Sequence, residues 1–422
     1  MLIFGVFINL ALLGYYKYSD FFIENINNIL NLQIPLLHLA LPLAISFFTF
    51  QQIAFLVDSY RQETSEYNFL NYALFVTFFP QLIAGPIVHH KEMMPQFFAT
   101  KNLVKNYKNI ALGLFIFSIG LFKKVVIADS FAVWADKGFD EATALNFIDA
   151  WSSSLSYTFQ LYFDFSGYTD MAIGAALLFN IKLPINFNSP YKALNIQDFW
   201  RRWHITLSRF LKDYIYIPLG GNRKGELYTY RNLMITFLLG GIWHGAAWSF
   251  LFWGFLHGLA LSIHRFWKRF QISMPKLLAW FLTFNFINIT WIFFRAHTWN
   301  DAFKVLHGMF HIEQKEISHF ISEKLTILEK LYQKIYNIFS TEIDTNRSHT
   351  IVSFFTHFRD EKYAFIYIVI AFITVLFAKN SQEIAQKFQA NSYYLAINTF
   401  LFVTAIYILS FGTYSEFLYF NF

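Results

Sequence analysis

The sequence predicts an all-α, polytopic integral membrane protein. Of its 422 residues, 56% are hydrophobic and 14% are charged, whereas about a quarter of the residues in a soluble domain are charged. Charge-free stretches recur along the chain, and about 20 apolar residues are enough for one helical span. The alternating pattern of transmembrane barrel strands is absent. We therefore expect about nine to eleven transmembrane or re-entrant helices.

The charge-free stretches give the expected helices in order. They cover residues 2–16, 34–57, 69–88, 109–122, 150–163, 232–264, 277–294, 363–378 and 388–415. As a single helix, residues 232–264 would be roughly 50 Å long. This stretch is therefore expected to break near Gly240-Gly241 and to turn back. No linker or tandem repeat divides the chain, so one integral membrane domain is expected over residues 1–422.

Residues 312–360 form the one sizeable polar segment, and they are expected to be a partly amphipathic insertion. Its apolar positions recur at helical spacing, namely Ile317, Phe320, Ile321, Leu325, Leu328 and Leu331. Such a helix could lie on the membrane surface. A docking surface for a soluble partner is the alternative.

The basic residues predict the topology. They cluster at residues 91–108, 182–231 and 265–276, and the positive-inside rule places these regions in the cytoplasm. Residues 312–360 and the C-terminus then lie outside, while Lys123-Lys124 falls on the wrong side of this count. The net charge of +6 is spread over loops, so it indicates orientation rather than nucleic-acid binding. The chain has no cysteine, so no thiol of its own can carry an acyl group.

An imidazole between glycines lies in the middle of the longest charge-free stretch. Residues 240–245 read Gly-Gly-Ile-Trp-His-Gly, with the imidazole at His244. A polar side chain at that depth is costly unless it faces a cavity or a partner, and flanking glycines allow close approach of another group. Histidine has its unperturbed pKa near neutrality. The pattern therefore predicts a buried catalytic base.

A second histidine occurs in residues 198–213, which read as one amphipathic helix. Trp200, Trp203, His204, Leu207 and Leu211 fall on one face at helical spacing. His204 would then point toward the core that contains His244. The alternative interpretation is an interfacial helix whose arginines bind lipid phosphates.

Two carboxylates interrupt a membrane segment at residues 163–170. Asp164 and Asp170 would each cost about 2.5–3.5 kcal/mol if unpaired. They could pair with cations, for which the candidates are Arg201, Arg202 and Lys192. Alternatively, they could contact the buried imidazoles, and Asp170 and Ser166 are candidate substrate-binding residues.

The chain ends in the aromatic sequence Phe-Leu-Tyr-Phe-Asn-Phe at residues 417–422. Aromatic residues beside a span are typical of the headgroup belt. Tyr419 is also a possible oxygen nucleophile, which would need a base such as histidine. Two histidines 40 residues apart, without cysteine or an HExxH pattern, make a weak ligand set, so no metal is expected.

Four ordered motifs resemble the membrane-bound O-acyltransferases. They are residues 163–174, 200–204 (Trp-Arg-Arg-Trp-His), 213–223 and 240–245. Their sequences are similar to those of the bacterial branch of the family that O-acetylates alginate and peptidoglycan. The branch that transfers D-alanine to teichoic acid shares the Trp-His and Trp-His-Gly pattern but lacks the Thr-Asp-Met-Ala-Ile-Gly and Pro-Leu-Gly-Gly-Asn-Arg sequences. Acetyl transfer therefore ranks above alanyl transfer.

The resemblance implies helices around a thin centre that is pierced by a tunnel between a cytoplasmic and an outer cavity. The family's central histidine matches His244, and the residue that accompanies it matches His204. A cytoplasmic thioester, expected to be acetyl-CoA, would supply the acetyl group, with no permanently bound cofactor. A periplasmic esterase-type partner would move it onto the polymer, which we expect to be peptidoglycan rather than alginate because the chain is compact. The expected location is the cytoplasmic (inner) membrane.

The resemblance also suggests roles for other residues. Trp203 or Trp243 would orient the thioester or stabilise charge. The candidates for contacting the phosphates of coenzyme A are Arg201, Arg202, Lys212, Arg223 and Lys224, although simple cytoplasmic anchoring explains them too. In the alanyl system a small partner ends in Phe-x-Tyr-x-x-Phe, and Phe417, Tyr419 and Phe422 repeat that spacing. Tyr419 is thus a candidate acyl relay.

Two non-enzymatic functions remain as alternatives. One is a transporter or channel, because buried histidine and aspartate residues also occur along proton and substrate pathways. The other is a membrane scaffold that docks a soluble acetyltransferase. Members of the branch carry further helices upstream of the region that matches residues 10–22, and this chain starts within that region. Either the gene is short or its start is truncated, and the missing helices would affect the rim more than the motif-bearing centre.

Overall fold

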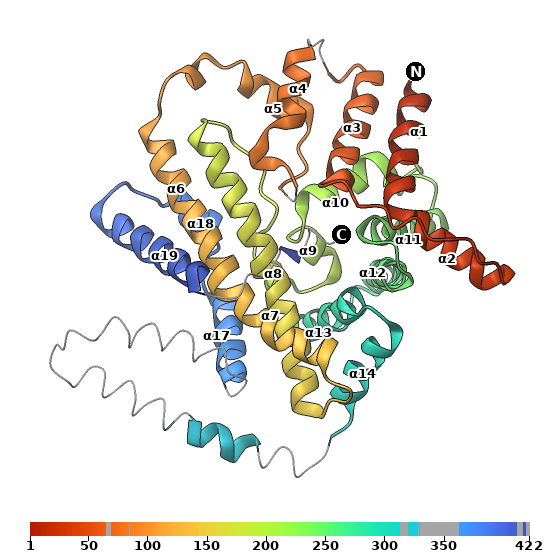
Figure 1. Cartoon of the computed structure of the whole chain (residues 1–422), viewed down its shortest axis with the longest axis vertical. Coiled ribbons are helices and arrows are strands. Elements are labelled where there is room, and N and C mark those ends of the chain that lie inside the picture. Colours follow the sequence, from red (N-terminus) through yellow and green to blue (C-terminus); the bar gives the residue numbers. More distant parts are fainter. Residues whose placement is uncertain are drawn as a thin grey trace. The chain divides into compact units, whose positions relative to one another are not determined.

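The regular structure is helical throughout the part of the chain that the structure describes (Figure 1). The computed structural model describes residues 1–64, 69–83, 85–312, 320–327, 329, 363–411 and 417–418, and no strand occurs among them. This confirms the all-α prediction. Contacts divide the chain into two compact units. The first comprises residues 1–126, 163–285 and 379–422, and the second comprises residues 127–162 and 286–378.

The first unit begins with a helix that changes its winding. α1 (Leu2–Leu13) passes through a π-helical turn (Gly14–Tyr18) into α2 (Ser19–Leu30). α3 (Ile45–Tyr60) packs against α1. The charge-free stretch 34–57 is helical only from Ile45 onward, because residues 32–42 have no regular structure.

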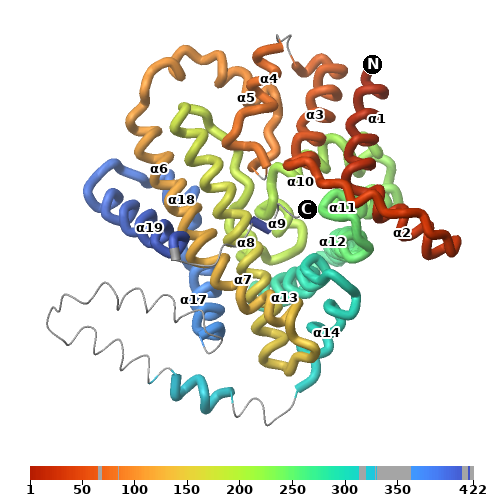
Figure 2. The backbone as a smooth tube through the Cα atoms, in the orientation of Figure 1, coloured from red at the N-terminus to blue at the C-terminus, as the bar shows by residue number. Residues whose placement is uncertain are grey.

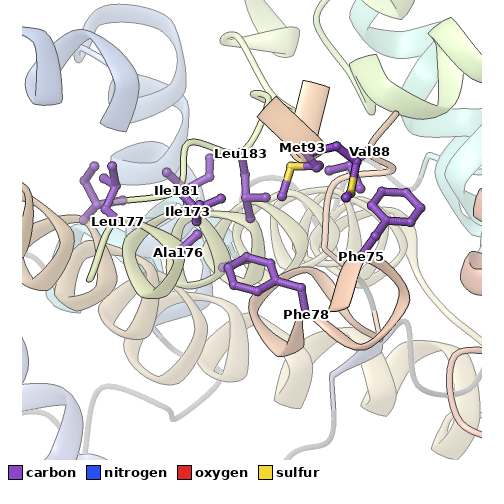
Figure 3. Close-up of a cluster of buried hydrophobic side chains, with 12 residues drawn as sticks. Phe75, Phe78, Val88, Met93, Ile173, Ala176, Leu177, Ile181 and Leu183 are labelled. Carbon is purple, nitrogen blue, oxygen red and sulfur yellow. The ribbon is translucent and has the colours of Figure 1, made fainter. Parts of the chain in front are cut away.

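The next helices meet in an apolar cluster. α4 (Phe69–Thr77) ends before Pro80, which interrupts the charge-free stretch 69–88. α5 (His90–Phe97) and α6 (Tyr107–Phe122) follow. Figure 3 shows that side chains from these separate segments gather in one place. The buried members are Phe75, Phe78, Val88, Met93, Met94, Ile116, Ala172, Ile173, Ala176, Leu177, Ile181 and Leu183. The cluster therefore joins the segment before α5 to α8 (Phe147–Leu178), which contributes residues to both units.

Glycines bring α6 and α8 into close contact. A Cβ atom at Gly120 would lie 2.5 Å from the carbonyl oxygen of Gly167, and one at Gly113 would lie 2.7 Å from that of Gly174. Small residues allow membrane helices to approach at this range. The same helix pair places the lysines that follow α6 beside the carboxylates of α8.

Short helices and a long hairpin complete the centre of this unit. α9 (Ile196–Trp200) and α10 (Ile205–Leu211) precede α11 (Glu226–His244) and α12 (Trp248–Trp267). α11 and α12 pack against each other as a hairpin (Figure 2). At its open end Glu226 pairs with Arg265 and Arg269, each at 2.8 Å. The predicted reversal of residues 232–264 is confirmed.

The position of that reversal was predicted wrongly. α11 continues through Gly240-Gly241, and the chain turns at residues 245–247. The reason is packing: a Cβ atom at Gly241 would lie 2.3 Å from the carbonyl oxygen of Phe250, and one at Gly254 would lie 2.3 Å from that of Phe237. These glycines therefore let two helices touch instead of breaking one of them.

The second unit contains parts of α8 and α13 (Lys276–Arg295) together with α7 (Asp129–Asp136), α14 (Trp299–Phe310) and α17 (Ala364–Phe377). Asn288 accepts hydrogen bonds from the hydroxyls of Ser154 and Thr158, at 3.1 and 2.7 Å. Such polar bonds hold helices together where apolar packing cannot distinguish protein from lipid. Arg295 pairs with Asp136 at 2.8 Å and also with Asp140.

Several helices can cross a membrane. Among the described residues, four helical stretches are long and apolar enough, namely Leu2–Leu30, Tyr107–Glu141, Lys276–Arg295 and Ser392–Ser410. α18 (Ser381–Gln386) and α19 (Ser392–Phe411) end the described helices of the first unit. The count of nine to eleven spans and the single domain over residues 1–422 stay predictions. Within 312–360, residues 320–327 are helical; most of the predicted insertion lies outside the described residues.

Candidate active site

His244 is the last residue of α11 and is buried, with 3% of its surface exposed. The carbonyl groups of this last turn are bound by the segment between α1 and α2. Lys17 Nζ donates to the oxygens of Trp243 and His244 at 2.6 and 3.2 Å, and the Tyr18 hydroxyl donates to that of Ile242 at 2.7 Å. A Cβ atom at Gly245 would lie 2.1 Å from the Phe250 ring. The glycine after His244 therefore permits a close approach, as the sequence predicted.

His204 is fully buried and does not lie on a continuous helix. It is the N-cap of α10, with φ 44° and ψ 54°, a left-handed conformation that costs about 1–3 kcal/mol for a residue with a side chain. The predicted helix over residues 198–213 is therefore wrong, because the chain breaks between α9 and α10. Residues 186–188 cause the break: Asn186 O accepts from Ile205 N–H, and Asn188 N–H donates to Arg202 O.

The Asn186 side chain also defines the tautomer of His204. Its Oδ1 lies 3.2 Å from His204 Nδ1 and accepts from the backbone N–H and the hydroxyl of Thr206, at 3.2 and 2.9 Å. An amide oxygen can only accept, so Nδ1 carries the proton. Nε2 is then the ring nitrogen that can accept a proton.

The Trp243 ring packs against both imidazoles. Its ring centroid is 4.9 Å from that of His244 and 6.2 Å from that of His204. The indole N–H donates to Ser46 O at 3.2 Å, and the ring stacks on Phe50 at 5.0 Å. The structure thus brings His204 and His244 to one aromatic junction. Trp203 packs in a neighbouring aromatic group, against Phe187, Tyr191 and Phe199.

The carboxylates of α8 have partners that differ from the predicted ones. Asp164 pairs with Lys124 at 2.8 Å, and Asp170 pairs with Lys123 at 2.6 Å. Asp170 also accepts from the Ser381 hydroxyl at 2.7 Å. The expected pairing with Arg201, Arg202 or Lys192 is therefore wrong; Arg202 binds Asp198 at 2.9 Å. These pairs also explain why Lys123-Lys124 did not fit the loop-charge count, since both lysines point at α8.

Ser166 is buried on the same helix. Close by, the described part of the C-terminal tail reaches Asp164. The backbone N–H of Leu418 donates to Asp164 Oδ2 at 3.2 Å, and the Phe417 ring lies 5.0 Å from that of Tyr168. The candidate relay Tyr419, together with Phe422, lies outside the described residues.

Two cavities adjoin the α11–α12 hairpin. One of about 680 Å³ lies toward its open end, where its cationic lining residues are Arg201, Lys212, Arg223, Arg265 and Lys268. Its apolar lining includes Trp200, Leu211 and Phe237. Lys224 lies over Gly220, another lining residue. The other cavity, of about 320 Å³, lies at the closed end, where Lys17 and Gly245 line it. Whether a tunnel connects them stays a prediction.

Comparison with known proteins decides the family. Residues 36–299 match the sequence profile of the membrane-bound O-acyltransferases. The chain belongs to the membrane-bound O-acyltransferase family. It is 53% identical to the peptidoglycan O-acetyltransferase of Helicobacter pylori, across 100% of this chain and 82% of that protein. It is 42% identical to the probable alginate O-acetylase AlgI of Pseudomonas aeruginosa, across 78% of this chain and 64% of that protein.

A more distant similarity is to the teichoic acid D-alanyltransferase of Bacillus subtilis, at 26% identity across 58% of this chain and 66% of that protein. The predicted resemblance to this family is confirmed, and so are the polytopic membrane fold and the O-acyltransferase activity. The roles assigned to individual site residues stay predictions. No cluster of three or more histidine, aspartate or glutamate side chains suited to a metal occurs among the described residues.

Sequence reasoning missed a further buried imidazole of this acyltransferase, close to His244. His257 on α12 accepts a hydrogen bond from the indole N–H of Trp200, at 3.1 Å between Nε1 and Nδ1. Its ring lies 4.6 Å from that of Trp253, which lies 5.1 Å from that of His244. His257 therefore connects the wall of the larger cavity with the aromatic group around His244. The signal was present, because His257-Gly258 repeats the His-Gly pair within the same charge-free stretch.

Proposed function

We propose that this O-acyltransferase takes an acetyl group from acetyl-CoA in the cytoplasm and passes it across the membrane for O-acetylation of peptidoglycan. The observation that carries the proposal is the cavity at the open end of the hairpin, which combines a cationic lining with an apolar one beside the helix that ends at His244. The choice of acetyl group and polymer is supported by the 53% identity to a peptidoglycan O-acetyltransferase. The 42% identity to a probable alginate O-acetylase makes alginate the second candidate polymer.

The cavity suits the two ends of a coenzyme A thioester. Guanidinium and ammonium groups bind phosphates through charge-assisted hydrogen bonds, and Arg201, Lys212 and Arg223 supply them. Ligand sites are otherwise mostly apolar, and Trp200, Leu211 and Phe237 would face the pantetheine arm and the thioester. The basic residues of the flanking loops support a cytoplasmic location for this end of the hairpin, by the positive-inside rule.

The chemistry needs a base at the acceptor hydroxyl. In our proposal His244 removes the hydroxyl proton while the oxygen attacks the acetyl carbonyl. A C–O bond forms, the C–S bond breaks, and the departing coenzyme A thiolate takes the proton from the imidazolium. His204 offers its Nε2 at the same aromatic junction and is the other candidate base. The indole N–H of Trp243 already donates to Ser46 O, which favours a positioning role for this ring over stabilisation of the oxyanion.

Cationic residues of the cavity provide the first test. In purified protein reconstituted in lipid nanodiscs with labelled acetyl-CoA, Arg223→Gln should raise KM for acetyl-CoA about tenfold or more, since a hydrogen bond to a charged group contributes about 1.5–3 kcal/mol. The value of kcat should stay within about twofold, because the phosphates do not react. Lys105→Gln is the control, because Lys105 is an exposed cation away from the cavity. Unchanged KM in Arg223→Gln would place the phosphates elsewhere.

Tyr419 is proposed as the first acceptor on the outer side, from which the acetyl group moves to a periplasmic esterase-type partner. The support is its spacing to Phe417 and Phe422 and the contact of the adjacent Leu418 with α8. Tyr419→Phe keeps the ring and removes the nucleophile, so acetyl transfer should fall to near background and no label should appear on the C-terminal peptide in mass spectrometry. Tyr393→Phe, at an exposed tyrosine, serves as the control. Near-normal transfer by Tyr419→Phe would refute the relay.

The same assay distinguishes the alternatives. A transporter would move substrate without covalent acetylation, and a scaffold would show no acetyl transfer without its soluble enzyme. We propose that the protein lies in the cytoplasmic (inner) membrane, because the proposed donor and acceptor lie on opposite sides of that membrane.

A further inference from the structure

Lys17 reaches from the N-terminal helix to the end of the helix that carries His244. It lies in the π-helical turn Gly14–Tyr18 between α1 and α2. Its ammonium group donates to three oxygens: Ser46 Oγ at 3.0 Å, Trp243 O at 2.6 Å and His244 O at 3.2 Å. An ammonium group has three N–H donors. All three are therefore occupied by groups of the protein.

The oxygens that Lys17 and Tyr18 bind are those that a helix leaves without partners. The last four carbonyl groups of an α-helix have no acceptor role within it. α11 stops at His244, and the following Gly245 is extended, with φ −167°. Tyr18 binds the oxygen of Ile242 at 2.7 Å, while Lys17 binds those of the next two residues. A cation at this end also interacts favourably with the helix dipole.

The contact links three segments that are distant in sequence. Ser46 near the start of α3 accepts from Lys17 through its hydroxyl and from the Trp243 indole through its carbonyl. The π-helical turn, the start of α3 and the last turn of α11 are thus joined by side chains. A lysine in a span would ordinarily extend its ammonium group toward the lipid headgroups; here the group is directed at a helix end.

We propose that Lys17 is a positioning residue, which holds the last turn of α11 so that His244 and Trp243 keep their places at the aromatic junction. It acts through the backbone and not on the substrate, since its donors are already used. The inference rests on the proposed role of His244. It gives the N-terminal helix a part in the active site.

Hydrogen exchange and kinetics on the full chain in nanodiscs test this role. Lys17→Met keeps an apolar stem and removes the donors. Amide exchange should accelerate in a peptide covering residues 238–247 and stay unchanged over 226–236, the other end of the same helix. The value of kcat for acetyl transfer should fall about 10- to 100-fold, as expected for a misplaced catalytic group, while KM for acetyl-CoA stays within about twofold. Lys17→Arg retains donors and should restore part of kcat.

Each outcome decides a separate point. Lys105→Met is the matched control, since it removes an exposed lysine and should change neither measurement. Unchanged exchange and unchanged kcat in Lys17→Met would overturn the inference. Faster exchange with normal kcat would leave Lys17 as a helix cap and reject its role in positioning. If the unaltered protein transfers no acetyl group, the proposed function fails, whereas the exchange profiles still show whether Lys17 holds this turn.

Discussion

Replacing His244 with glutamine is expected to lower kcat for acetyl transfer by about 10²- to 10⁴-fold, the range that a positioned general acid–base group contributes. Glutamine retains hydrogen-bonding groups of similar size but cannot take up the acceptor proton. KM for acetyl-CoA should change little, because the cationic residues proposed to bind the phosphates line the cavity at the other end of the hairpin. Initial rates with labelled acetyl-CoA in nanodiscs measure both parameters.

The control for this substitution is His297→Gln, whose side chain is 77% exposed in the second unit. It should retain full activity. Both variants should be compared at equal protein levels in the membrane, so that loss of folding is not mistaken for loss of chemistry. His204→Gln adds a second comparison: a larger loss there than in His244→Gln would make His204 the base. Robust transfer by His244→Gln would contradict the mechanism.

The features that could be predicted are those that depend on the length of an apolar stretch or on a single motif. The hairpin of residues 232–264 and the burial of His244 follow from one long charge-free stretch with an imidazole inside it. The site of reversal did not follow, because a glycine pair can mean either a break or close helix packing. Only the contact of Gly241 with Phe250 on the partner helix distinguishes the two.

Interactions between segments that are distant in the chain could not be predicted from the sequence. The spacing of Trp200, Trp203 and His204 was typical of one helix face. However, the backbones of Asn186 and Asn188 form hydrogen bonds with the backbone groups of Ile205 and Arg202, and the helix is interrupted at this point. The carboxylates of α8 were correctly identified as needing partners, yet Lys123 and Lys124 looked like loop charges. The contacts of Lys17 could not be predicted either, because two of its three acceptors are backbone oxygens more than 200 residues away.

Breaking the ion pair between Lys124 and Asp164 should cause a large loss of stability. The two side chains are 5% and 2% exposed and their charged atoms lie 2.8 Å apart. Lys124→Met would leave a buried carboxylate without its cation, and removing one partner of a buried pair costs about 3–5 kcal/mol. It would also remove the ammonium group that lies 4.8 Å from the Phe417 ring. We expect a fall of this size in the free energy of unfolding, measured by equilibrium SDS titration in mixed micelles.

Two further variants separate this effect from a general loss of charge. Lys91→Met breaks the pair with Glu63, whose side chains are 54% and 42% exposed, and such pairs contribute about 0–1 kcal/mol. The double variant Lys124→Met/Asp164→Leu should recover part of the loss, because apolar residues of similar volume often replace a buried pair at little cost. Recovery should remain incomplete, since Asp164 also accepts the backbone N–H of Leu418. Equal stability of Lys124→Met and Lys91→Met would mean that the α6–α8 contact does not depend on this charge pair.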